Sequence, residues 1–173
     1  MGSLRQDQAQ MGGITVDLTV VPVVSASPDY TSGDVMGTKT EIVNAGRLSS
    51  TDASGQSVDS RGVIMSVVIS DKAEQSLDID VLFFKSEPST GTYTDNGAFA
   101  LDDADALLCI GVAHVTDWTD GGTGSDIGFD SNLGFAFDLG AANASLWIVV
   151  VARGGHNLGS TSDLQIRVGI LAD

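Results

Sequence analysis

The segment from residue 117 to 131 carries the side chains best suited to bind a metal ion. Four aspartates lie among its glycines: Asp117, Asp120, Asp126 and Asp130. Hard cations such as calcium prefer several carboxylate and carbonyl oxygens on flexible backbone, so a calcium site at these residues is one interpretation. The spacing fits no EF-hand, and residues 121–126 match a calcium-binding β-roll repeat only once, without a tandem copy. A solvated acidic loop is the favoured interpretation.

Groups that could act as a nucleophile or a base are few and scattered. His114 lies in a strand-like run and His156 in a glycine turn, and no second reactive group is tied to either by a recognisable spacing. Cys109 lies in an apolar run without a neighbouring cation, where a thiol behaves as a small buried hydrophobe. Asp102 and Asp105 could form a carboxylate pair of the glycosidase kind, but a solvated helix start explains them more simply. The sequence therefore predicts that the protein is not an enzyme.

Trp118 lies in the same acidic segment and has two interpretations. An exposed indole is a stacking platform for a sugar ring in lectin-like sandwiches, whereas a buried indole closes one end of a sandwich. The buried position is favoured, because no Tyr or second Trp stands beside it in the sequence. A lectin-like or calcium-binding β-sandwich that recognises a glycan or a host surface remains the alternative function.

Composition limits the partners that the chain can have. The 173 residues are 42% hydrophobic and 18% charged, with 21 Gly and 3 Pro, which is typical of a folded, turn-rich β protein. The 8 basic and 23 acidic residues give a net charge of −15. Such a surface repels nucleic acid phosphates and anionic lipids, so neither nucleic acid nor a membrane is expected as a partner. Because no signal-peptide core or long apolar run is present, the chain is expected to be made in the cytoplasm.

Strand-like runs of alternating apolar and polar residues fill most of the chain. They are expected at residues 14–24, 34–43, 62–70, 77–84, 109–115, 133–139, 146–152 and 164–171. About eight short strands without an amphipathic helix predict an all-β fold, an antiparallel β-sandwich with a jelly roll as the favoured variant. The runs 62–70 and 77–84 are expected to form a hairpin whose second strand is half-buried.

The remaining segments are expected to be loops or short turns. Residues 117–131 are rich in Gly and Asp and predict a long loop, whereas residues 102–108 predict one helical turn capped by Asp102 or Asp103. The run 146–152 is apolar on both faces, which predicts a central strand.

The chain divides into a short arm and one domain. Residues 1–13 are polar and end in two glycines, which predicts a flexible N-terminal arm, and residues 14–173 are expected to form a single β-sandwich domain. Leu4 and Met11 are the only large apolar anchors of the arm. Together with Ile14, at the start of the first strand, they are the expected partner-binding residues.

Four pieces of the chain, in order, carry a resemblance to a known group of proteins. The pieces are residues 30–37, 62–72, 80–84 with Pro88, and 94–105. In pattern and order they resemble small virion proteins of tailed bacteriophages, over about half of the chain. The resemblance implies a head decoration or cement protein on the capsid exterior, a β-rich homotrimer whose partner is the major capsid protein. Such a protein binds several shell subunits at once, so that modest contacts multiply through effective concentration.

Overall fold

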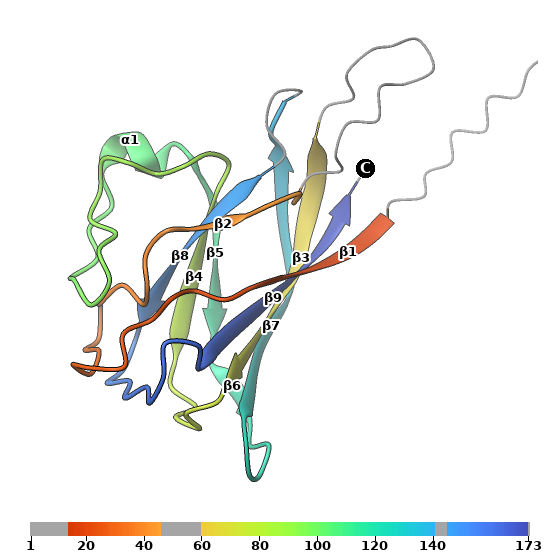
Figure 1. The fold of residues 1–173 in the computed structure, drawn as a ribbon. Coiled ribbons are helices and arrows are strands. Elements are labelled where there is room, and N and C mark those ends of the chain that lie inside the picture. The colour runs from red at the N-terminus through yellow and green to blue at the C-terminus, as the bar shows by residue number, and fades with distance from the viewer. Residues whose placement is uncertain (1–13, 46–59, 141–144, 173) are drawn as a thin grey trace, which may run out of the picture.

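The computed structural model describes residues 14–45, 60–140 and 145–172. Within these ranges, nine strands form two antiparallel sheets that pack face to face, with one short helix outside them (Figure 1). The first sheet contains, in spatial order, β1 (Ile14–Val20), β9 (Leu164–Ala172), β3 (Arg61–Asp71), β7 (Asp126–Asp138) and β6 (Asp117–Thr119). The second contains β2 (Thr40–Ile42), β8 (Leu146–Ala152), β4 (Ile79–Phe84) and β5 (Cys109–Val115). The helix, α1, spans Asp103–Ala106, and no helix in the described ranges is long and apolar enough to cross a membrane.

The first and second halves of the chain pair strand by strand, like the two arms of one long hairpin. β1 pairs with β9, β2 with β8, β3 with β7 and β4 with β5, so each strand of the first half meets its counterpart from the second half. Rolling such a hairpin into two sheets gives the strand order of a jelly roll, here with β6 added beside β7. The predicted all-β antiparallel sandwich is therefore confirmed, with nine strands in place of about eight.

The expected hairpin between the runs 62–70 and 77–84 is wrong, because β3 and β4 lie in different sheets. The turn after β3 carries the chain across the sandwich. Its shape depends on the buried carboxylate of Asp71, which accepts hydrogen bonds from the amides of Ala73 (2.9 Å) and Gln75 (2.8 Å). A buried carboxylate that binds nearby amides in this way stabilises a turn in place of continued pairing.

The long loop expected at residues 117–131 is also wrong, because β6 and β7 occupy most of it and only residues 120–125 connect them. The glycines and aspartates of this segment disfavour a strand in isolation, but pairing of β7 with β3 along its length outweighs that preference. The expected strand 34–43 is shorter than predicted, with β2 covering only Thr40–Ile42. The runs 109–115 and 146–152 coincide with β5 and β8, and β8 is central as predicted.

Two apolar clusters hold the fold together. The larger one lies between the sheets and contains the inward side chains of β3, β4, β8 and β9. The smaller one lies outside the second sheet and contains Val35, Leu82, Phe84, Tyr93, Val149 and Val151. Residues 85–108, which we call the cover, run over this outer cluster and include α1 (Figure 1). Because β4 is buried on both faces, the expectation of a half-buried strand is wrong.

Candidate functional site

The outer faces of the two sheets differ in what lies on them. The second sheet is closed by the cover, whereas the outer face of the first sheet, which we call the bare face, exposes large apolar side chains. Ile127 and Phe129 on β7 are 37% and 42% exposed, and Leu171 on β9 is 39% exposed. The side chains that alternate with them point inward and are mostly buried. This alternation is typical of a sheet with one face on the core and the other in solvent. The bare face is the candidate surface for binding another protein.

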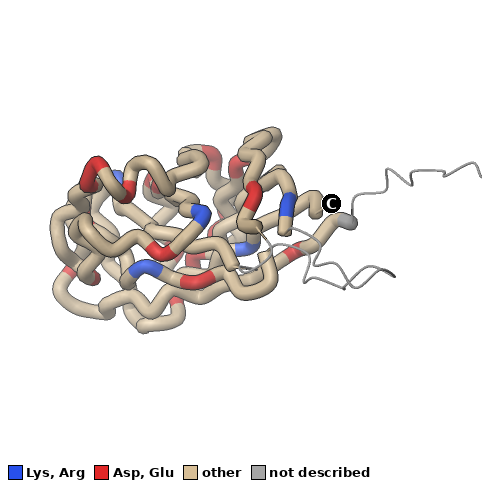
Figure 2. Tube along the Cα trace, turned by 90° about the horizontal axis from the view of Figure 1, so that it is seen from above, with Lys and Arg blue, Asp and Glu red and all other residues tan. Residues whose placement is uncertain are grey.

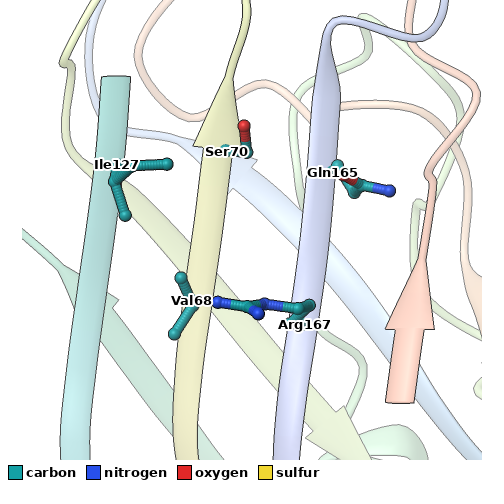
Figure 3. A pocket seen from close by; sticks show the side chains of 5 residues that line it. All are labelled: Val68, Ser70, Ile127, Gln165 and Arg167. Carbon is teal, nitrogen blue, oxygen red and sulfur yellow. The ribbon is translucent and has the colours of Figure 1, made fainter. Parts of the chain in front are cut away.

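A shallow depression lies in the bare face, with a volume of about 180 Å³. Its lining comes from three neighbouring strands: Val68, Ser70, Ile127, Gln165 and Arg167 (Figure 3). The strand register places Val68 opposite both Arg167 and Phe129, and Ser70 opposite both Gln165 and Ile127. The depression is therefore apolar at Val68 and Ile127 and polar at Ser70 and along its β9 side.

The four aspartates of the predicted calcium site lie at different levels of the β6–β7 hairpin. Asp117 is exposed on β6, and Asp120 accepts a hydrogen bond from the amide of Gly122 at 2.6 Å. Asp126 is buried and accepts from the hydroxyl of Ser76 at 2.5 Å, and Asp130 accepts from the amide of His114 at 3.0 Å. Within the part of the chain that the structure describes, no three His, Cys, Asp or Glu side chains are grouped to hold a metal ion.

We expect calcium to leave the melting temperature of the protein unchanged. Asp126 and Asp130 already accept hydrogen bonds from the protein, so a cation would have to displace these contacts before it gained ligands. Thermal unfolding in millimolar calcium and in a chelator measures the effect. A rise in melting temperature that saturates with calcium, and is lost in Asp126→Asn, would instead establish the site.

Trp118 is half-buried against the inner core, which agrees better with the interpretation that the sequence favoured than with an exposed platform. Its indole packs against the inner core, and it lies opposite Gly128 on the neighbouring strand. A Cβ atom at Gly128 would lie 2.8 Å from the indole ring and 2.7 Å from Val115, so only glycine leaves room for the ring. The indole Nε1 is buried and makes no hydrogen bond to the described residues. This side chain closes the sandwich between β6 and β5 and is not placed as a platform for sugars.

The structure joins His114 to a carboxylate that sequence reasoning did not connect with it. Asp80 on β4 lies opposite His114 on β5, and the imidazole Nδ1 lies 2.7 Å from Oδ1 of Asp80. The other carboxylate oxygen accepts a hydrogen bond from Nε of Arg153 at 2.6 Å. Asp80 is almost fully buried, whereas the other two side chains are largely exposed. Its charge is thus balanced by Arg153, which directly follows β8. The register of β4 against β5 places His114 beside Asp80, and the register of β4 against β8 places Arg153 there.

The cover is organised by two carboxylates. Asp105 is buried and accepts four hydrogen bonds, from the amides of residues 89–91 and from the hydroxyl of Tyr93 at 2.7 Å. Burial alone raises the pKa of Asp105, but these hydrogen bonds outweigh it and hold that pKa below its usual value. Asp95 accepts from the hydroxyl of Tyr30 at 2.6 Å, and burial with this bond raises the pKa of Tyr30 to about 12. Both carboxylates are held by hydrogen bonds from the protein itself.

The other predicted residues of this region have structural positions. Asp102 caps α1, as predicted, by accepting a hydrogen bond from the amide of Ala104, so it does not face Asp105 across a cleft. Cys109 is half-buried, and burial raises the pKa of its thiol. His156 is buried, with its two ring nitrogens 3.2 and 3.3 Å from the carbonyl oxygens of Gly154 and Leu77.

The expected partner-binding residues fall mostly beyond the described ranges. Leu4 and Met11 lie outside the described residues. Ile14 is the first residue of β1 and pairs with Ala172 at the end of β9. The arm therefore joins the body at an edge strand of the first sheet.

Comparisons with known proteins give no match in sequence and a distant similarity in structure. No family model matches the chain, and no curated protein is similar to it in sequence. The chain is similar to a chain in the X-ray crystal structure of tomato aspermy virus, with 13% identity and a TM-score of 0.42. The similarity covers 98% of this chain and 85% of the viral one.

Proposed function

We propose that this chain is a structural protein of a tailed-bacteriophage particle, which binds the outer surface of the head and stabilises it. The observation that carries the proposal is the difference between the two outer faces. One is closed by the chain's own cover, and the other exposes Ile127, Phe129 and Leu171 over a broad sheet. A sheet face with exposed apolar side chains suits contact with another protein of the particle, either the shell or a neighbouring copy of this chain, better than capture of a small molecule.

The contacts of two buried carboxylates, Asp71 and Asp105, and of the half-buried Asp95 support a structural role over catalysis. Asp71, Asp95 and Asp105 all bind amides or hydroxyls of neighbouring segments and thereby fix turns and the cover. Aspartate and glutamate are spread along the described part of the trace, where lysine and arginine are few (Figure 2). The net charge of −15 keeps many copies soluble when they are crowded on one particle.

The N-terminal arm is the proposed grip on the shell. Leu4 and Met11 are apolar anchors in a polar segment, and the arm continues into Ile14 at an exposed edge of the sandwich. The partner in this proposal is the major capsid protein. Each contact is modest, and the attachment gains its strength from several contacts to the shell at once.

We expect the purified full chain to bind heads that lack their decoration, and to raise the temperature at which these heads rupture. Cosedimentation and a thermal rupture assay measure the two effects. A chain without residues 1–13 is expected to remain folded but to lose most of its binding, because the apolar anchors are gone. If the full chain does not cosediment with such heads at any concentration, the proposed function is wrong. If the truncated chain binds as well as the full chain, only the role of the arm is wrong.

A further inference from the structure

We propose that two copies of this chain pair face to face through the bare face. The occupant of that face is a second copy of the same chain, related to the first by a two-fold axis. The inference stands on the charge, shape and extent of the bare face, and it does not require a role in a virion.

Charge makes the bare face the place where two copies repel each other least. Two bodies with a net charge of −15 repel over most of their surfaces. The charged side chains that the described strands place on the bare face are Arg61, Arg167, Asp17, Asp117 and Asp138. Nε of Arg61 lies 3.0 Å from a carboxylate oxygen of Asp138, and Nη1 of Arg167 lies 3.8 Å from one of Asp17. Each arginine is thus matched by an aspartate, and the face is close to neutral.

Shape makes the bare face complementary to itself. Phe129 is 42% exposed, and the strand register places it opposite Val68, one of the residues that line the depression. In a two-fold contact, if residue i of one copy contacts residue j of the other, then residue j of the first copy also contacts residue i of the second. The Phe129 ring of each copy can therefore enter the depression of the other. There it would lie on aliphatic side chains beside the guanidinium of Arg167, an arrangement favourable for an aromatic ring.

The extent of the face is sufficient for a reversible dimer. Strands of this length rise ~3.3 Å per residue and lie ~4.8 Å apart, so the central strands present roughly 30 Å by 20 Å. Pairing would bury about 600 Å² on each copy, or about 1,200 Å² in total, the lower end of the range for specific interfaces. Two sheets that pack face to face lie about 10 Å apart, which leaves room for the side chains of both faces. We therefore expect a dimer with micromolar affinity.

A two-fold pair differs from the homotrimer that the resemblance implies. A closed ring of three copies needs two different patches on each copy, one for each neighbour. The bare face contains both the protruding ring and the depression on one surface, which favours the two-fold pair. A pair of copies also carries two N-terminal arms, which would strengthen any attachment through the arm.

Molar mass in solution tests the inference. Light scattering and sedimentation equilibrium of the full chain should show a concentration-dependent species of twice the 17.8 kDa chain mass. Phe129→Arg should weaken dimerisation by about 100-fold or more, because it places a cation against Arg167 of the other copy. The matched control is Val23→Arg, at an apolar side chain that is 71% exposed outside the bare face, and it should leave the dimer intact. Ile127→Lys is the second disrupting variant, and the melting temperature of each variant verifies its fold.

Charge exchange tests the specific contact. Combining Phe129→Arg with Arg167→Glu should restore most of the dimer, because the new arginine then meets a glutamate on the other copy. A mass of three chains, a monomer at all concentrations, or a dimer untouched by both Phe129→Arg and Ile127→Lys would each overturn the inference. A chain that is monomeric yet binds heads would leave the proposed function standing, and a dimer that does not bind heads would leave this inference standing.

Discussion

Asp105→Asn is expected to lower the free energy of unfolding by about 3 kcal/mol. The carboxylate of Asp105 accepts hydrogen bonds from three successive amides, those of residues 89–91, and from the hydroxyl of Tyr93. An asparagine side chain has one acceptor oxygen and a donor group, so at least one buried donor faces another donor. Each buried donor left without an acceptor costs about 1–3 kcal/mol, and bonds to a charged acceptor are the stronger ones. Urea unfolding of the two proteins measures the difference.

Asp103→Asn is the matched control, because Asp103 is exposed in the same helix. Its effect is expected to stay within about 0.5 kcal/mol. If both variants lose the same stability, the role assigned to the Asp105 carboxylate is wrong.

The contribution of Asp105 should also depend on pH in a defined direction. The folded protein holds the pKa of Asp105 below its usual value, so folding favours the ionised form. The resulting stability is fully present above the pKa of the unfolded chain, about 4, and is lost as pH falls below that value. The stability gap between the wild type and Asp105→Asn should therefore be constant near neutral pH and narrow below about pH 4. If the difference in stability between the two proteins does not change down to pH 2, the role proposed for the ionised Asp105 carboxylate is wrong.

Local pattern was sufficient to predict the fold class and two whole strands. The run 146–152 was assigned to a central strand because both of its faces are apolar, and this strand became β8. The pairing of strands that are distant in the sequence is harder to predict, because adjacent runs such as 62–70 and 77–84 have the pattern of a hairpin. Only the crossing turn at Asp71 reveals that these runs belong to different sheets. Periodicity reports which residues share a face, and it does not report which sheet a strand joins.

The candidate site was harder to predict for the same reason. Ile127 and Phe129 lie in a segment so rich in Gly and Asp that it was assigned to a loop, so their exposure on a sheet was not predicted. The link between Asp80 and His114 depends on the register of β4 against β5, which no local spacing records. Trp118 was assigned correctly, because its lack of aromatic neighbours is visible in the sequence itself.

Phe84→Ala is expected to lower the free energy of unfolding by about 3–5 kcal/mol, the usual cost of removing a fully buried phenylalanine. The side chain of Phe84 is 0% exposed, although it lies on the outer side of β4, which an ordinary sandwich would leave to solvent. Its ring meets that of Tyr93 in the cover edge-on, with centroids 6.3 Å apart. Asp105 and Phe99 also contact Tyr93, so loss of the Phe84 ring removes one of the three contacts described for this tyrosine. Chemical unfolding measures the loss.

The location of the damage separates this variant from a defect in the inner core. Amide hydrogen exchange in Phe84→Ala should rise first in the cover, residues 85–108, because that segment depends on the outer cluster, whereas β3 and β9 should keep their protection until global unfolding. Leu107→Ala is the matched control, since Leu107 is a cover residue that is 79% exposed, and it should cost less than about 0.5 kcal/mol. If exchange in Phe84→Ala rose equally in both sheets, the cover would be an inseparable part of the sandwich and not a layer added to it.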